Sequence, residues 1–524
     1  MQTLSARVDS SRDEIGAVIY LTLLGLAVRL AAPLMSVFPL NDGGLFYSMI
    51  VDLQSNGFAL PLTTTYNAAD IPLAYPPLAF YLTAFFAKIS GAPVLDLLRI
   101  LPAVLSGLAI PVFYLLAKEL AHTKLQTILA VLAFAFLPRT FEWHVTGGGI
   151  TRSLGFIFAI LTLVFVMRLY KNASAKNTLL CILCGTLTLL THPEAAVHTA
   201  ISAGVFYLWT NRSIKGLAAS LGIALGVLSL SSPWWLTVIL RHGTAPFQAA
   251  FSAAGADSVN PLARVFVGFL FVFADEPYLT LLSVFALIGL FASLARRASL
   301  LPVWMFLLYL LEPRGGPLYM MLPLSLLAGL GLDAVVLSGL LGQSPPNDAG
   351  VALRQILNHK SARWFLIFLF AYTLMSAFAT GERLRQDFSL QSADVDALHW
   401  VRDHTPASSV FAVVTGESTP FRDPWSEWFP AITKRKSLGT IFGYEWVNDG
   451  KFAERIQIYN DLQACAWKDA ACLAAWETES GLNFDYVYMQ KEEPILPLQS
   501  NLDATETWRL LYETETARIY QRAR

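Results

Sequence analysis

The hydrophobic pattern consists of long apolar runs separated by short polar connections. The first run, 15–35, has about the 20 residues that a membrane-spanning helix needs and is too long for the core of a signal peptide. Ten further runs lie at 95–117, 124–138, 154–170, 177–191, 195–210, 215–233, 278–295, 299–311, 317–338 and 361–380. The pattern predicts a polytopic α-helical membrane protein with about 11 transmembrane helices.

Lysines and arginines gather in alternate connections between these runs. They are Lys118, Lys124, Arg168, Lys171, Lys176, Arg212, Lys215, Arg296, Arg297, Arg354, Lys360 and Arg363. Because cytoplasmic loops carry an excess of such residues, we expect a multi-pass protein of the plasma (inner) membrane with a cytoplasmic N-terminus. Connections 36–94, 138–153, 233–277 and 312–316 then lie on the opposite, outer side, with the chain after about 381.

The composition becomes that of a soluble protein after Gly381. Helices are expected up to His404 and over 451–463, and strands at 410–415, 484–489, 508–513 and 517–521. We therefore divide the chain into a membrane domain, 1–380, and a small extracytoplasmic α/β domain, 381–524. The second domain has no glycine-rich phosphate motif, so nothing indicates that it binds a nucleotide.

The outer connection 36–94 is long for a loop, and long loops are usually functional or disordered. Within it, an apolar helical face ends at Gly57 and predicts a helix lying on the membrane surface; it consists of Leu45, Phe46, Met49, Ile50 and Leu53. A second surface helix is expected at 262–274.

Composition and charge narrow the class of protein. Hydrophobic residues make up 55% of the 524 residues and charged residues only 14%, against about 25% charged in soluble domains, which excludes an ordinary soluble enzyme. The 37 basic and 38 acidic residues nearly cancel, so no charge imbalance points to nucleic acid. Of the four cysteines, Cys181 and Cys184 fit the apolar core, and Cys465 and Cys472 could pair in an oxidising compartment.

Candidate chemistry gathers in the outer connections. Asp42 follows the first run; it could act as a general base, ligate a cation, or cap the helix that follows, as Asn41 could. Tyr75 precedes Pro-Pro-Leu, a helix start. The remaining candidates are Glu142, His144, Gly147 to Gly149 and Arg152 in one loop, His192 and Glu194 in His-Pro-Glu, and Arg314 after Glu312.

Each of these residues also has an ordinary structural explanation. The glycine loop with Arg152 could bind a phosphate or form an interfacial turn, and His144 fits a hydrogen-bonding structural role. The His-Pro-Glu stretch starts a helix, and Arg314 could pair with Glu312 or with an anionic ligand. Their placement on one membrane face, where a lipid phosphate would lie, favours a shared role.

The first span, the outer Asp42 and the Pro-Pro-Leu helix start resemble the GT-C membrane glycosyltransferases, which include protein O-mannosyltransferases and lipid A aminoarabinose transferases. The stretches Gly-Gly-Gly-Ile-Thr-Arg, His-Pro-Glu, Glu-Trp-Phe-Pro (427–430) and Gly-Tyr-Glu-Trp (443–446) look like an uncharacterised prokaryotic branch. The resemblance implies transfer of a hexose or pentose from a polyprenyl-phosphate donor to an extracytoplasmic protein, lipid or glycan. It also implies membrane lipids as partners and no nucleic acid.

The resemblance also implies residue roles. Asp42 matches the first-loop acid, a general base or metal ligand, while Arg314 and Arg152 match donor-phosphate binding. Tyr75 stands where related motifs carry lysine, and Glu142 is the nearest substitute for a second acid. Glu142, His144, His192 and Glu194 are candidates for contacting the acceptor or a metal, Mg²⁺ or Mn²⁺, with Asp42 as the first ligand if one is bound. The alternatives are a transporter or flippase of lipid-linked substrates and a non-catalytic membrane scaffold.

Overall fold

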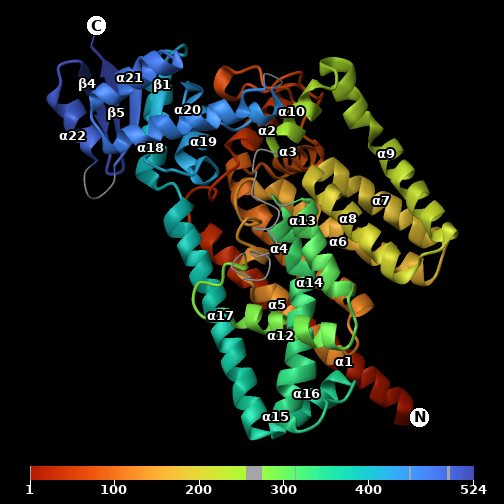
Figure 1. The fold of residues 1–524 in the computed structure, drawn as a ribbon. Helices are drawn as coiled ribbons and strands as arrows, with labels where there is room; N and C mark the ends of the chain where they lie inside the picture. The colour runs from red at the N-terminus through yellow and green to blue at the C-terminus, as the bar shows by residue number, and fades with distance from the viewer. Residues whose placement is uncertain (1, 255–273, 313, 448–449, 492–495, 524) are drawn as a thin grey trace.

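The protein is mainly a bundle of long helices with a mixed α/β region at one end (Figure 1). The computed structural model describes residues 2–254, 274–312, 314–447, 450–491 and 496–523. The bundle helices are α1 (Gln2–Met35), α4 (Val94–Leu120), α5 (Lys124–Phe136), α6 (Gly149–Lys171), α7 (Ala175–Thr191), α8 (Pro193–Thr210), α9 (Ile214–His242), α12 (Leu281–Ala295), α13 (Leu300–Leu311), α14 (Gly316–Gly331) and α17 (Lys360–Phe388). Shorter elements are η2 (Pro138–Thr140), α10 (Ala245–Ala254), the π-helical η4 (Leu332–Leu337), α15 (Ser338–Leu341) and α16 (Ala349–Asn358).

All eleven predicted apolar runs form helices, but fewer qualify as full membrane spans. Among the described residues, six helical segments are long and apolar enough to cross a membrane. A seventh is added if α12 and α13, which are bent by 120° at their junction, count as one broken span. Helices α5 and α7 have 13 and 17 residues, short of the roughly 20 that a span needs. The number of about 11 spans is therefore not confirmed, because apolar periodicity does not measure helix length.

The long connection after α1 folds into ordered structure. It contains α2 (Gly44–Ser55), η1 (Tyr66–Ala68) and α3 (Leu78–Ser90). Leu45, Met49, Ile50 and Leu53 of α2 are buried, as the sequence pattern requires. However, α2 packs against α3 and a helix of the C-terminal region, α19 (Pro424–Thr433), so protein covers this face where the sequence suggested lipid. The expected helix at 262–274 lies outside the described residues except for Ala274.

The C-terminal region contains a five-stranded sheet in the order β2-β1-β3-β5-β4. Strands β1, β2 and β3 are parallel, and β5 joins β3 and β4 antiparallel. The strands are β1 (Val410–Val414), β2 (Lys436–Ser437), β3 (Tyr486–Gln490), β4 (Trp508–Glu513) and β5 (Ala517–Arg522). The other elements are α18 (Ser392–His404), η5 (Pro420–Arg422), α19, η6 (Tyr444–Trp446), α20 (Phe452–Ala464), η7 (Cys465–Trp467), α21 (Ala470–Ser480) and α22 (Pro497–Ala504).

This region shares a hydrophobic core with the membrane part. One buried cluster contains Met49 and Phe80 from the long connection together with Trp428, Phe429 and Tyr488 from the C-terminal region. Cys465 and Cys472 form a disulfide beside α20 and α21, while Cys181 and Cys184 are buried and unpaired. The shared core holds the C-terminal region against the end of the bundle that carries most of the candidate residues.

Candidate active site

Asp42 lies in a tight turn between α1 and α2. The turn is formed by Asn41, whose φ is +50°, and Gly43, whose φ is +134°, a conformation that favours glycine. Neither Asn41 nor Asp42 caps α2, because the N-cap position is Gly43 and it makes no side-chain cap. The Asp42 carboxylate is therefore directed elsewhere.

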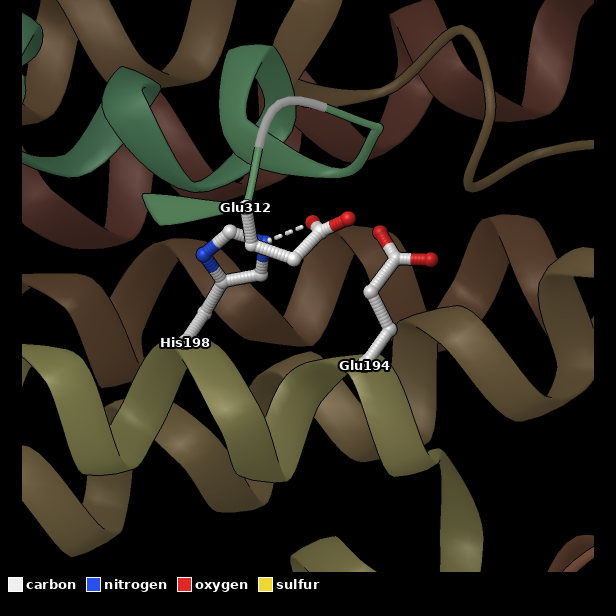
Figure 2. A group of neighbouring side chains, drawn as sticks. All are labelled: Glu194, His198 and Glu312. Carbon is white, nitrogen blue, oxygen red and sulfur yellow. Dashed lines mark hydrogen bonds and ion pairs between the residues drawn. The ribbon is translucent and has the colours of Figure 1, made fainter. Parts of the chain in front are cut away.

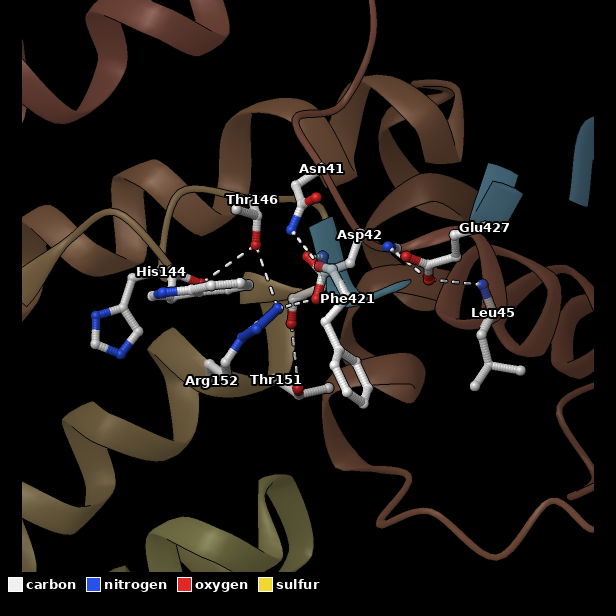
Figure 3. A network of polar contacts seen from close by, with 12 residues as sticks. Asn41, Asp42, Leu45, His144, Thr146, Thr151, Arg152, Phe421 and Glu427 are labelled. Carbon is white, nitrogen blue, oxygen red and sulfur yellow. Dashed lines mark hydrogen bonds and ion pairs between the residues drawn. The ribbon is translucent and has the colours of Figure 1, made fainter. Parts of the chain in front are cut away.

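The glycine loop before α6 receives the Asp42 carboxylate (Figure 3). The Gly148 backbone N–H donates to Asp42 Oδ1 at 3.1 Å and to the Asp42 carbonyl at 2.9 Å. A Cβ on Gly148 would lie 2.7 Å from the Asp42 carboxylate carbon, so a larger residue does not fit here. The anion that this loop approaches in the structure is thus a side chain of the protein itself.

Arg152, in the first turn of α6, forms an ion pair with Asp42 Oδ2. Its Nη2 also donates to Thr146 Oγ1 at 3.2 Å, and its guanidinium lies 5.7 Å from the centre of the Trp143 ring. The Arg152 Nε is buried and has no hydrogen-bond partner. Asp42 and Arg152 are 110 residues apart in sequence, and the structure brings them into direct contact.

A second carboxylate, Glu427 of α19, stands on the other side of the Asp42 turn (Figure 3). Its Oε1 accepts hydrogen bonds from the backbone N–H groups of Gly43 at 3.0 Å and Leu45 at 3.4 Å. Glu427 is 3% exposed and its Oε2 has no partner. Burial, reinforced by the negative charge of Asp42, raises the pKa of Glu427 well above its usual value. Glu427 thus takes the capping role that the sequence suggested for Asn41 or Asp42.

Trp428 holds the same turn from α19. Its indole N–H donates to the Asn41 carbonyl at 2.7 Å, and its ring packs edge-on against Phe38 at 4.8 Å. In the sequence, the Glu-Trp-Phe-Pro stretch indicated a resemblance but not the contacts that Glu427 and Trp428 make with the Asp42 turn. No local pattern could have found them, because they join positions more than 380 residues apart.

Tyr75 is buried among polar groups from two bundle helices. Its hydroxyl lies 2.6 Å from His192 Nδ1 and 3.2 Å from Thr151 Oγ1. Its ring contacts Phe46 and Trp446 at 4.9 and 5.7 Å between centroids. Tyr75, His192 and Thr151 therefore form one polar network, and Thr151 directly precedes Arg152 in the chain.

Arg314 lies on the connection between α13 and α14, with its side chain exposed. The guanidinium lies 5.7 Å from the centre of the Phe421 ring, and it forms no ion pair with a carboxylate among the described residues. Glu312 does not pair with this guanidinium; its carboxylate contacts His198 Nε2 at 2.7 Å and accepts from the Arg314 backbone N–H at 3.2 Å. Within the described part of the chain, a ligand would therefore displace no ion pair of the Arg314 guanidinium.

Glu142 and His144 are engaged in structural contacts away from the Asp42 carboxylate. Glu142 pairs with Arg139 at 2.7 Å, and burial raises its pKa to about 7. His144 Nδ1 lies 2.8 Å from the Thr140 carbonyl, and burial lowers the pKa of His144 to about 3. The carboxylate that bonds to the Asp42 turn is Glu427, whereas Glu142 pairs with Arg139.

Comparison with known proteins identifies families and structures that are similar to this chain. The family model described as dolichyl-phosphate-mannose-protein mannosyltransferase matches residues 74–236. No curated protein matches the sequence. The chain has the fold of the GT-C membrane glycosyltransferases, which confirms the resemblance noted in the sequence.

Three solved structures illustrate the likeness. The archaeal oligosaccharyltransferase AglB from Archaeoglobus fulgidus, in complex with an inhibitory peptide and a dolichol-phosphate, has a TM-score of 0.59 at 14% identity over 91% of this chain and 69% of AglB. ArnT from Cupriavidus metallidurans, bound to undecaprenyl phosphate, has a TM-score of 0.51 at 15% identity over 96% of this chain and 98% of ArnT. The mycobacterial arabinofuranosyltransferase AftD has a TM-score of 0.53 at 14% identity over 96% of this chain and 40% of its own.

Proposed function

We propose that this protein is an integral-membrane glycosyltransferase that moves a sugar from a polyprenyl-phosphate donor to an acceptor outside the cytoplasm. The observation that carries the proposal is the ion pair between Asp42 and Arg152 at the N-terminus of α6. A carboxylate beside a cation suits a reaction in which a hydroxyl loses a proton while a phosphate gains charge. The AglB and ArnT structures, which hold dolichol-phosphate and undecaprenyl phosphate, support this donor class.

The reaction is a single displacement at the sugar. The acceptor oxygen attacks the anomeric carbon, the bond from that carbon to the phosphate oxygen breaks, and polyprenyl phosphate leaves. Asp42 takes the proton of the acceptor hydroxyl as general base. Energy for the transfer is already stored in the donor, so no nucleotide is needed.

The leaving phosphate needs cationic side chains whose N–H donors are not all bonded to other groups of the protein. Arg152 has five N–H donors, and its buried Nε lacks a partner. Binding of a phosphate to Arg152 would weaken its ion pair with Asp42 and free that carboxylate to act as a base. Arg314 offers a second guanidinium, and the Tyr75 hydroxyl, in place of the lysine of related motifs, offers a neutral donor.

A Mg²⁺ or Mn²⁺ ion does not fit at Asp42 while Arg152 is paired with it. The two carboxylate oxygens already accept from Gly148 N–H and from the Arg152 guanidinium. A divalent cation would meet the positive charge of Arg152 at the same atoms. We therefore route no step of the transfer through a metal at this position.

The location of the reaction follows from the predicted orientation. With the N-terminus in the cytoplasm, the Asp42 turn and the C-terminal region face the outer side of the plasma membrane. The Cys465–Cys472 disulfide supports this placement, because disulfides persist in oxidising compartments.

Native mass spectrometry of the detergent-purified protein tests the donor class. We expect the wild type to retain a polyprenyl-phosphate lipid and Arg314→Ala to lose most of it. Arg212→Ala is a matched control, because Arg212 is also exposed and lies 6.0 Å from the Trp209 ring. It should retain the lipid as the wild type does.

Asp42→Asn distinguishes a glycosyltransferase from a transporter or a scaffold that binds the same lipid. As a general base, Asp42 should be dispensable for lipid binding and required for turnover, so this variant should keep the lipid and lose about 100-fold or more of the activity. Full turnover by Asp42→Asn would remove Asp42 from the mechanism. Failure of any form to retain an added polyprenyl phosphate would instead favour a transporter or a scaffold.

A further inference from the structure

Three potential metal ligands converge between α8 and the start of the α13–α14 connection (Figure 2). Glu194 and His198 are four residues apart on α8 and therefore share one face of the helix. Glu312 follows the last residue of α13 and reaches the same point from the other side. One ligand atom from each residue lies within 4.8 Å of the other two.

Local contacts hold this group in place. Glu312 Oε2 accepts from the Gly315 backbone N–H at 2.8 Å and lies 2.7 Å from His198 Nε2. His198 is fully buried. A Cβ on Gly315 would overlap the Glu194 carboxylate, so only glycine leaves room for that carboxylate. The acidic group and the loop thus occupy one closely packed site.

Two polar groups at this site, the buried Tyr319 hydroxyl and the partly exposed Glu194 carboxylate, accept or donate no hydrogen bond within the described part of the chain. The Tyr319 ring stacks on the His198 ring at 4.2 Å, its side chain is 2% exposed, and its hydroxyl has no hydrogen-bond partner. The charges of Glu194 and Glu312 both act on that hydroxyl. Within the described part of the chain, the Glu194 carboxylate accepts no hydrogen bond, and its one ion pair is to His192 at 4.0 Å. A buried hydroxyl without a partner, such as that of Tyr319, usually marks a missing ligand or water.

We propose that Glu194, His198 and Glu312 bind a divalent transition-metal ion, with Zn²⁺ or Mn²⁺ as the best fit. One imidazole and two carboxylates form a mixed nitrogen and oxygen ligand set that such ions accept. Ligand atoms about 2.1 Å from one ion lie at most about 4.2 Å apart, so small side-chain rotations complete the site. Three protein ligands leave a coordination position of the ion open for water.

This ion would have a structural role and would not take part in proton transfer at Asp42. It would fix the α13–α14 connection to α8 two residues before Arg314, and it would neutralise two facing carboxylates. Its ligands are residues other than Asp42 and Arg152. Metal binding needs neither donor nor acceptor, so the test is independent of the proposed transferase function.

The experiment measures Zn²⁺ bound per chain by elemental mass spectrometry after equilibrium dialysis, on protein purified with a histidine-free tag. Binding of Co²⁺, followed by its visible absorption, reports the ligand set. The variants are Glu194→Gln, His198→Gln and Glu312→Gln, and the control is His404→Gln, an exposed histidine of α18. We expect one Zn²⁺ per wild-type and control chain, and affinity lower by about 100-fold or more in each ligand variant.

Either of two results would overturn the proposal: no stoichiometric metal on the wild type, or unchanged affinity in Glu194→Gln and Glu312→Gln. These two side chains are partly exposed, so their variants should remain monodisperse even if His198→Gln does not fold. Zn²⁺ should also raise the unfolding temperature of the wild type and not that of Glu312→Gln, because an ion that binds only the folded state stabilises it.

Discussion

At the residue scale, the candidate site was predictable as a set of side chains but not as a set of pairs. Asp42 and Arg152 stand out in the sequence because charges beside apolar runs are costly. Their ion pair could not be predicted, since 110 residues separate them and several cations were available. Glu427 was missed for the same reason, and His198 because it lies inside an apolar run. Long-range packing, which local patterns do not encode, decides each of these contacts.

The buried Glu427 makes stability depend on pH. Its folded-state pKa is raised, so between the unfolded value of about 4.3 and the raised value the folded protein holds a proton that the unfolded chain releases. Stability from this group is complete below the unfolded pKa and falls as pH rises through the folded pKa, by up to about 1.4 kcal/mol per pH unit.

Glu427→Gln cannot ionise and should remove this slope while keeping an acceptor for Gly43 and Leu45. Thermal unfolding of the purified protein from pH 5 to pH 8 should therefore show a smaller loss in Glu427→Gln than in the wild type. The exposed Glu479→Gln on α21 is the control and should follow the wild type. Parallel curves for the wild type and Glu427→Gln would mean that Glu427 is ionised in the folded protein.

At the scale of elements, the sequence predicted which segments are helical, but it did not predict which parts of the protein pack against them. The apolar face of α2 is real, but α19 and α3 cover it. Arg29 gives a second example, because an arginine near the end of an apolar span ordinarily extends its charged head toward water. It is instead 1% exposed and caps the C-terminus of α5 by donating to the Ala135 carbonyl at 2.8 Å. It also donates to Ser106 Oγ of α4 at 3.0 Å and Thr140 Oγ1 at 3.2 Å.

Arg29→Leu should therefore loosen the junction of α1, α4 and α5. It leaves several buried acceptors without a donor, and we expect a loss of about 3 kcal/mol in the free energy of unfolding. Chemical denaturation in detergent would measure it, with the exposed Arg363→Leu as the control. A loss below about 0.5 kcal/mol would show that the acceptors find other partners.

At the scale of the whole molecule, the boundary near residue 381 describes composition better than packing. The strands expected at 410–415, 484–489, 508–513 and 517–521 correspond to β1, β3, β4 and β5. Nothing in the sequence indicated that the C-terminal region and the long connection after α1 share one core. Such a core depends on three-dimensional contact between segments that are each amphipathic on their own.

Trp428→Ala tests whether the shared core acts as one unit. Removing a fully buried tryptophan should cost about 3–5 kcal/mol and also remove the hydrogen bond to Asn41. Hydrogen exchange should therefore accelerate at residues 40–50 as well as in α19, and stay unchanged in α7. Acceleration confined to α19 would mean that the two parts fold independently. Trp428→Phe, which keeps a ring against Phe38, should show a smaller effect.

The hydrogen bond between Glu427 and Gly43 can form only late in synthesis of the chain. Gly43 leaves the ribosome 384 residues before Glu427. At the usual 5–20 residues per second, the first loop waits for about 20–80 s before the helix that secures it has been made. Over that interval the Asp42 turn lacks the capping carboxylate and the Trp428 contact. The conformation of the Asp42 turn is thus completed only after α19 has been synthesised.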